Sequence, residues 1–452
     1  MDRTENRMGV MPIRRLVLSM SWPMMLSMLV QALYNMVDSV FVSWLNNDAF
    51  VALSLVFPVQ SLITAIQAGT GVGVNTMLSR RLGQKRTEEA RAVAVHGYAV
   101  YLCYWLVFAL AGWFGARPFM MLYTDQDRVI EYGVTYLRIV TILSLGSCMQ
   151  FATERVLQAG GNAVGPMIIQ GLGAVTNLVL DPILIFGLLG VPAMGVAGAA
   201  LATGLGQLVG MLIGLTMVAR KGVVKVSLKG FRPQAAVLAD IYRIGVPAIA
   251  MQSLFTVMSL GMNKILGLFS ETGVFIMGAY FKAQSFIFMP TFGLNNGLTP
   301  VVSYNYGAKS PERVSGAIRF ALQIGGTIML AGMLIFWLVP GPLLSLFRAD
   351  EATLAAGIPA LRILSLTFLP ACVSILLSSA FQAVGKPSYS LWLSLFRQML
   401  LLFPTALLLG RLAGPGAVWY AFVIAEGLPC IAAALLYRRV YRTGIAPIDG
   451  LS

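Results

Sequence analysis

Twelve apolar segments dominate this sequence and limit the folds that the chain can adopt. Most of them reach the roughly 20 residues that an α-helix needs to cross the hydrocarbon layer of a bilayer. Only 11% of the residues are charged, whereas a soluble globular chain carries about 25%. The sequence therefore predicts an all-α membrane protein with twelve transmembrane helices. The predicted segments are residues 16–45, 49–78, 93–115, 134–157, 164–188, 195–219, 241–269, 273–305, 315–339, 357–384, 388–411 and 415–437.

An internal repeat divides the chain into two similar halves. A shift of 224 residues places Pro23 on Pro247 and Trp113 on Trp337. Further matches under the same shift are Gly69 with Gly293, Gly73 with Gly297, Pro118 with Pro342, Arg138 with Arg362 and Gln158 with Gln382. Each half holds six segments, so both halves enter the membrane in the same sense. We predict two pseudo-symmetric six-helix bundles: an amino-terminal lobe at residues 1–219, a cytoplasmic linker at 220–240 and a carboxy-terminal lobe at 241–452.

Basic residues gather in alternate loops and predict the orientation of the chain. They cluster around residues 80–91, 220–232, 309–319 and 438–442, whereas the intervening loops are acidic or poor in Lys and Arg. The positive-inside rule then places both termini in the cytoplasm, and we expect a multi-pass protein of the cytoplasmic membrane. The same loops explain the net charge of +14 without nucleic acid as a partner. The lone His96, at a loop–helix junction, is expected on the solvated surface.

A carboxylate stands near the middle of the fifth segment. Asp181 lies four residues after Asn177, so both side chains share one helix face. A buried carboxylate costs about 2.5–3.5 kcal/mol on insertion scales, which requires compensation. Pro182 has no N–H and frees the carbonyl of Leu178. Carboxylate, amide and carbonyl oxygens together bind hard cations or protons. The alternative is a polar face that only hydrogen-bonds a neighbouring helix.

Polar residues also form a stripe along the first segment. Gln31, Tyr34, Asn35 and Asp38 recur at intervals of three and four, which places them on one helix face. We expect Asp38 to lie close to the Asn177 and Asp181 face. Two carboxylates in a dry site cannot both ionise cheaply, so one has a raised pKa or a cation such as Na⁺ neutralises the pair.

Thr203 in the sixth segment offers a hydroxyl to the same site, or it bonds back to a carbonyl of its own helix. Under the 224-residue shift Asp38 matches Met262 and Asp181 matches Thr405. Because the acidic pair occurs in one half alone, we interpret it as functional. Three other intramembrane charges, Glu154, Lys282 and Glu426, have no assigned role, and a local ion pair with Arg155 is the simplest account of Glu154.

Glycines and prolines within the segments predict helix packing and bending. We expect two glycine rows to allow close helix contact: Gly69-x-Gly71-x-Gly73 and Gly206-x-x-x-Gly210-x-x-x-Gly214. The first row is not expected to be a phosphate loop, because a phosphate loop follows a strand and no strand precedes this row. No Walker sequence G-x-x-x-x-G-K-[ST] occurs, so the chain has no ATP site of that type. Pro23 interrupts the first segment and can bend it.

With these features in view, the chain resembles the multidrug and toxic compound extrusion (MATE) family, in particular its DinF-like and MepA-like bacterial branch. Leu33-Tyr-Asn-Met-Val-Asp38-Ser-Val-Phe-Val42 is similar to the first helix of that family. Ser79-Arg-Arg-Leu-Gly83 and Gln158-Ala-Gly-Gly-Asn162 are similar to its inner loops. The resemblance covers nearly the whole chain.

The resemblance implies a transporter that is no enzyme, holds no cofactor and exports lipophilic, often cationic compounds against inward H⁺ or Na⁺. It implies an amino-lobe site for the coupling ion. It also implies a bend of the first helix at Pro23 and a substrate cavity along that helix. The residues matched to the coupling site are Asp38, Asn177, Asp181 and Thr203, and those matched to the cavity are Met28 and Gln31, beside Tyr34 and Asn35 of the same stripe. Acidic residues that other branches place in the carboxy-terminal lobe are not at matching positions.

We therefore expect a monomeric secondary antiporter for small organic molecules. Two other functions stay open at this point. A lipid-linked precursor flippase of the related superfamily would carry cationic residues deep in its cleft to hold pyrophosphate. A membrane receptor or scaffold without transport fits buried carboxylates poorly. The choice between Na⁺ and H⁺ stays open as well, because carboxylates bind both.

Overall fold

The computed structural model describes residues 7–222, 224, 226, 231–347 and 350–447. Within the helices, a few residues are described by their backbone alone. These are Asn35, Asp38, Ser39, Val40, Val42, Ser43 and Lys221.

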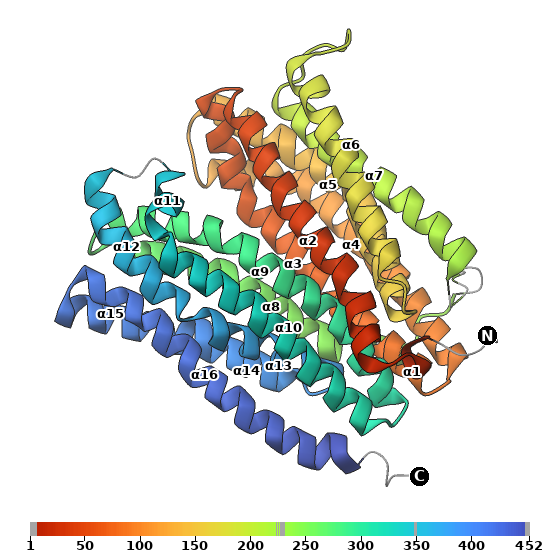
Figure 1. The fold of residues 1–452 in the computed structure, drawn as a ribbon. Helices are drawn as coiled ribbons and strands as arrows, with labels where there is room; N and C mark the ends of the chain where they lie inside the picture. Colours follow the sequence, from red (N-terminus) through yellow and green to blue (C-terminus); the bar gives the residue numbers. More distant parts are fainter. Residues whose placement is uncertain (1–6, 223, 225, 227–230, 348–349, 448–452) are drawn as a thin grey trace. The chain divides into compact units, whose positions relative to one another are not determined.

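The amino-terminal half forms a short helix followed by six long helices (Figure 1). The short helix α1 spans Arg7–Val10. The long helices are α2 (Ile13–Ser43), α3 (Asn47–Gly83), α4 (Thr87–Met121), α5 (Asp127–Ala159), α6 (Val164–Phe186) and α7 (Val196–Lys221). Helix α5 packs against α3, α4 and α7, and α6 packs against α7.

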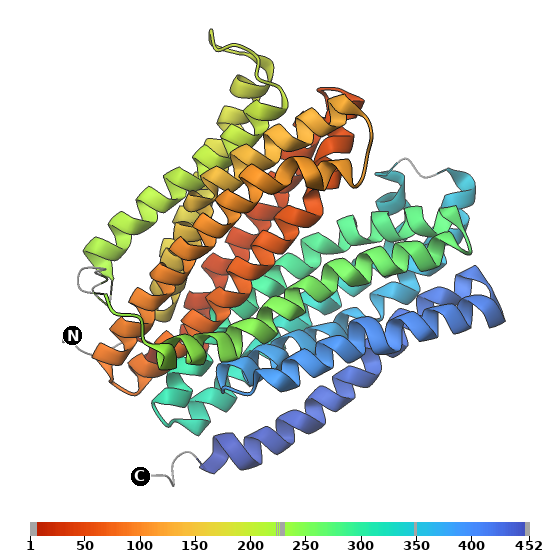
Figure 2. The ribbon, with the colours of Figure 1, turned by 180° about the vertical axis from the view of Figure 1, so that it is seen from behind.

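The carboxy-terminal half repeats the plan with more interruptions, and Figure 2 shows its helices from behind. Its helices are α8 (Ala235–Gly267), α9 (Glu271–Gly307), α10 (Pro311–Leu338), α11 (Pro340–Ser345), α12 (Glu351–Ser365), α13 (Phe368–Ala383), α14 (Pro387–Leu395), α15 (Leu402–Ala413) and α16 (Val418–Val440). A π-helical segment, Phe396–Leu401, joins α14 to α15, and a second one, Tyr441–Ile445, follows α16.

These helices confirm the predicted all-α membrane fold. Among the described residues, ten helices are long and apolar enough to cross a bilayer, and the pair α12 and α13, bent by 41°, makes an eleventh. The remaining predicted segment corresponds to the 37-residue helix α9. Leu106, Leu110 and Phe114 of α4 recur every four residues and are 47%, 59% and 73% exposed. Such a row of exposed apolar side chains suits contact with lipid.

The chain packs into two compact units whose boundaries fall inside two helices. One unit consists of Leu26–Gly245, and the other of Met1–Met25 with Val246–Ser452. The chain passes from one unit to the other just after Pro23 in α2 and just before Pro247 in α8. These prolines are equivalent in the repeat. The beginning of each half's first long helix, residues 13–25 and 235–245, is here termed its leading segment. Each leading segment thus belongs to the unit formed mainly by the other half.

The repeated glycines are the places where these leading segments pack. A Cβ atom on Gly297 of α9 would lie 2.6 Å from the Cα atom of Ser21 in the first leading segment. A Cβ atom on Gly73 of α3 would lie 2.3 Å from the carbonyl oxygen of Ile241 in the second. Only glycine allows helix backbones to approach this closely. We predicted that the glycines Gly69, Gly71 and Gly73, which lie in α3, allow close helix packing. At Gly73 this prediction is confirmed.

His96 lies in the interior, so the prediction of a solvated surface position was wrong. Its side chain is 2% exposed, and Nε2 accepts a hydrogen bond of 2.8 Å from the backbone N–H of Gln234. Nδ1 lies 2.7 Å from the carbonyl oxygen of Ala92 and donates to it, since Nε2 is the acceptor. The Phe231 ring packs edge-on against the imidazole. The segment before α8 folds back over α4 and covers the histidine, which its position in the sequence did not reveal.

Candidate functional site

The site begins with a close contact between α6 and α7. A Cβ atom on Gly206 of α7 would lie 2.7 Å from the carbonyl oxygen of Gly173 on α6 and 3.1 Å from the Cβ atom of Asn177. Further along the same row, a Cβ atom on Gly210 would lie 2.7 Å from Oε1 of Gln150. The predicted packing role of this glycine row is confirmed. The close approach brings Asn177 on α6 opposite Thr203 on α7.

Asn177, Asp181 and Thr203 form a buried polar cluster at this contact. Their exposed fractions are 2%, 0% and 9%. Nδ2 of Asn177 donates to Oδ1 of Asp181 and to Oγ1 of Thr203, both at 3.4 Å. Thr203 also donates to the carbonyl oxygen of Ala199, at 3.0 Å. Both sequence-based alternatives for Thr203 therefore apply at once, because one hydroxyl can donate and accept.

The cluster offers oxygen atoms to a cation. Oδ1 of Asn177 is buried and has no hydrogen-bond partner, which is costly unless a ligand supplies one. The described residues contain no group of three or more His, Cys, Asp and Glu side chains that suits a metal ion. The predicted sites at Asn35 and Asp38 belong to α2, but their side chains lie outside the described residues. The expected pairing of Asp38 with Asp181 stays a prediction.

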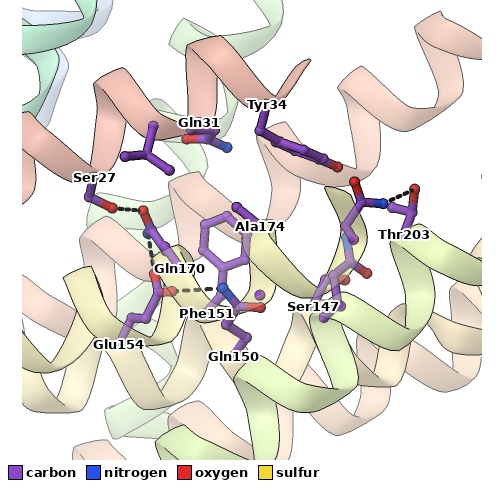
Figure 3. Close-up of a pocket in the computed structure, with 15 residues that line it drawn as sticks. Ser27, Gln31, Tyr34, Ser147, Gln150, Phe151, Glu154, Gln170, Ala174 and Thr203 are labelled. Carbon is purple, nitrogen blue, oxygen red and sulfur yellow. Dashed lines mark hydrogen bonds between the residues drawn. The ribbon is translucent and has the colours of Figure 1, made fainter. Parts of the chain in front are cut away.

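A cavity opens beside the cluster, within the unit formed by Leu26–Gly245 (Figure 3). Its empty space is about 670 Å³ when the open mouth is counted, and about 120 Å³ of it can hold the centres of water-sized groups. Gln31 and Tyr34 of the predicted stripe line it, whereas Met28 is not among its lining residues. The complete lining is Ser27, Val30, Gln31, Tyr34, Ser147, Gln150, Phe151, Glu154, Gln170, Gly173, Ala174, Asn177, Thr203, Gly206 and Gln207. The proposed hinge residue Pro23 is buried and lies within the continuous helix α2.

Glu154 of α5 is held in this cavity by amides. Gln150 donates to one carboxylate oxygen at 2.9 Å, and Gln170 of α6 donates to the other at 2.8 Å. Ser27 of α2 in turn donates to Oε1 of Gln170. Arg155 instead donates to Oε1 of Gln158, at 2.9 Å. The prediction of a local ion pair between Glu154 and Arg155 was therefore wrong. Consecutive residues of a helix do not face each other.

Glu426, in the other unit, forms an ion pair with an arginine. Its carboxylate lies 3.3 Å from Nη1 of Arg397, and both side chains are 19% exposed. Arg397 belongs to the π-helical segment Phe396–Leu401, whose extra residue per turn redirects the side chains that follow. A charge pair within the membrane neutralises both groups. Glu426 therefore differs from Glu154, whose carboxylate is hydrogen-bonded by two amides and forms no ion pair among the described residues.

Long apolar helices around a polar cavity are typical of membrane transporters. Comparison with known proteins gives the family. The family model MatE matches residues 23–183 and 247–408, one stretch in each half. The chain is 26% identical to a FAD transporter of Shewanella oneidensis strain MR-1, over 95% of both chains. It is 26% identical to the multidrug export protein MepA of Staphylococcus aureus strain N315, over 94% of this chain and 93% of that protein. A solved structure described as MATE in complex with MaL6 covers 100% of both chains, with 26% identity and a TM-score of 0.92.

The chain belongs to the MatE family. It is therefore a multi-pass membrane transporter and no enzyme, and the predicted resemblance is confirmed.

Proposed function

We propose that this protein is a secondary antiporter that exports lipophilic, often cationic compounds in exchange for H⁺ or Na⁺. It works as a monomer in the cytoplasmic membrane, with both termini in the cytoplasm. The observation that carries the proposal is the buried cluster of Asn177, Asp181 and Thr203, two members of which, Asn177 and Thr203, line an open polar cavity. A carboxylate at 0% exposure is stable only with compensation, and a proton or a Na⁺ ion supplies it.

The polarity of the cavity favours cationic or neutral cargo. Among its fifteen lining residues none is Lys or Arg, and most are neutral amides, hydroxyls and apolar groups. A flippase for lipid-linked pyrophosphate needs fixed positive charge in its cleft. The lining of this cavity does not supply that charge, so the exporter is the better supported function.

Coupling requires that ion binding favours one conformation over another. Helix α2 carries Gln31 and Tyr34 of the cavity, and the chain passes between the two units within that helix, two residues after Pro23. We propose that Pro23 is the hinge and that ion binding at Asp181, with Asp38, alters the bend of α2. A near-complete switch needs a preference of about 5.5 kcal/mol for one state.

The test is gradient-driven efflux of ethidium in proteoliposomes, with a pH gradient and a Na⁺ gradient imposed separately. The active gradient identifies the coupling ion. We expect Asp181→Asn to reduce coupled efflux to background, because the amide keeps the shape but loses the charge. Asp125→Asn, on the exposed loop after α4, serves as the control and should transport normally. Wild-type efflux by a folded Asp181→Asn variant would refute the assignment.

A further inference from the structure

Glu154 is the one acidic side chain among the residues that line the cavity (Figure 3). It is 1% exposed, although the cavity itself is open, because its neighbours surround it. The amino-lobe site proposed above does not use this group. A charge in such a position requires an explanation, since isolated buried carboxylates are costly.

The neighbours of Glu154 hold the carboxylate without neutralising it. Gln150 and Gln170 each donate an amide N–H, which suits a group that accepts at both oxygens. In the described part of the chain no ion pair involves Glu154. The guanidinium of Arg155 lies over the Phe151 ring, 5.7 Å from its centroid, and donates to Gln158. Within the described residues, then, no guanidinium or ammonium group bonds directly to the Glu154 carboxylate, and the charge of Arg155 acts on it only through space.

We propose that Glu154 binds the positively charged group of an organic cation in this cavity. A carboxylate has about four acceptor positions, and the two amides occupy two of them. An ammonium or amidinium N–H can bond to the remaining ones and cancel the charge. The rings of Phe151 and Tyr34 line the same cavity, and aromatic faces attract planar cations. The inference rests on the proposed function, and it assigns the cargo a site separate from Asp181.

Gln170 is a positioning residue that links this cation site to α2. Its amide donates to Glu154, and its carbonyl oxygen accepts from the hydroxyl of Ser27, which is 2% exposed. Ser27 lies four residues beyond Pro23 on the same helix. A cargo that pulls on Glu154 therefore acts through two hydrogen bonds on the part of α2 that follows the hinge. This gives cargo binding a physical path to the helix that the coupling ion is proposed to bend.

The test measures binding of ethidium to the purified full-length protein by fluorescence titration. We expect Glu154→Gln to raise the Kd for ethidium about tenfold or more, the loss of one hydrogen bond to a charged group. The Kd for a neutral dye of similar size should stay within about twofold, because shape and polarity remain. An unchanged ethidium Kd in folded Glu154→Gln overturns the proposal, as does an equal loss for both dyes.

Glu426→Gln is the matched control, because it makes the same change at a partly buried carboxylate that lies outside the cavity. It should leave the ethidium Kd unchanged. If Glu154→Gln does not fold, Glu154→Asp decides, since it withdraws the carboxylate by one methylene. A rise in the Kd for ethidium alone supports the proposal, and an equal change in the Kd for both dyes, or no change in either, overturns it.

Failure of this proposal and of the proposed function can be told apart. Asp181→Asn should abolish coupled efflux while the ethidium Kd stays near the wild-type value. Should Asp181→Asn transport normally while Glu154→Gln loses ethidium binding, the antiport assignment falls and the cation site stands. Should Asp181→Asn lose coupled efflux while Glu154→Gln binds ethidium normally, the cation site falls and the antiport assignment stands.

Discussion

At the residue scale, the hydroxyl of Thr203 serves two partners in different helices. It donates to Ala199 within α7 and accepts from Asn177 of α6. The amide of Asn177 is thereby turned so that its unpaired oxygen stays available beside Asp181. The position of one oxygen ligand thus depends on a residue that carries no charge.

We predict that Thr203→Val weakens the site without removing it. Valine has the shape of threonine but accepts no hydrogen bond, so stability should fall by about 1 kcal/mol. The half-saturating concentration of the coupling ion should rise several-fold, because the Asn177 amide is held less firmly. Thermal unfolding and ion-dependent efflux measure the two effects. Thr176→Val is the control: that hydroxyl is exposed and bonds only to its own helix at Leu172, so both quantities should stay near wild type.

The sequence predicted those features of the site that depend on local spacing. Asn177 and Asp181 share a face because four residues make about one helical turn. Thr203 was predicted as a possible hydroxyl ligand from the sixth segment, and the family resemblance pointed to the same residue. The partners of Glu154 lie on α5, α6 and α2, and nothing in the spacing of Ser27, Gln150 and Gln170 reveals that they meet. The burial of His96 could not be predicted for the same reason, because the residue that bonds to it, Gln234, lies 138 residues later in the sequence.

At the scale of elements, the distance between α6 and α7 decides whether the site forms. Gly173 and Gly206 face each other, and neither leaves room for a side chain. The cluster of Asn177 and Thr203 lies one turn from this contact. Any widening between the two helices lengthens the hydrogen bond from Asn177 to Thr203, which is already 3.4 Å.

We predict that Gly206→Ala lowers stability by about 1–3 kcal/mol through overpacking and also impairs efflux. Gly171→Ala on α6 is the matched control, because its added Cβ atom would have nothing within 4 Å. There alanine should be neutral or stabilising by up to about 1 kcal/mol, since it favours the helix. Thermal midpoints and ethidium efflux distinguish the pair. Equal effects of both substitutions would show that the α6–α7 contact is unimportant.

The predicted segments matched the helices well where a helix runs unbroken, but not where a proline interrupts it. The segment 357–384 is divided in the structure into α12 and α13. Pro370 lies in the first turn of α13 and cannot donate to the carbonyl of Leu366, so the bend falls there. Apolar content alone gave no sign of this break.

At the scale of the whole molecule, the repeat predicted two lobes, but packing divides the chain elsewhere. Matching residues show which parts are alike, and they do not show which parts touch. Ser21 donates to the carbonyl oxygen of Leu294, and Arg313 donates to those of Met8 and Met11. In the other unit Arg81 pairs with Asp240 at 3.3 Å. Each leading segment is therefore fastened to the half that did not supply it.

We predict that the chain survives a cut in the linker. Co-expressed fragments 1–222 and 223–452 should co-purify through a tag on one of them, because each contributes a leading segment to the other's unit. Fragments that lack residues 1–25 and 223–245 serve as the control and should not. Recovery of the tagged shortened fragment with its partner would contradict this account.

The exchange of leading segments also orders events at the ribosome. Residues 13–25 pack against α9, which begins only at Glu271, so the start of the chain waits while some 250 further residues are made. At about 5–20 residues per second the delay is roughly tens of seconds. During that time the newborn amino end carries apolar surface with no final neighbour, so biogenesis is most vulnerable before the second half emerges.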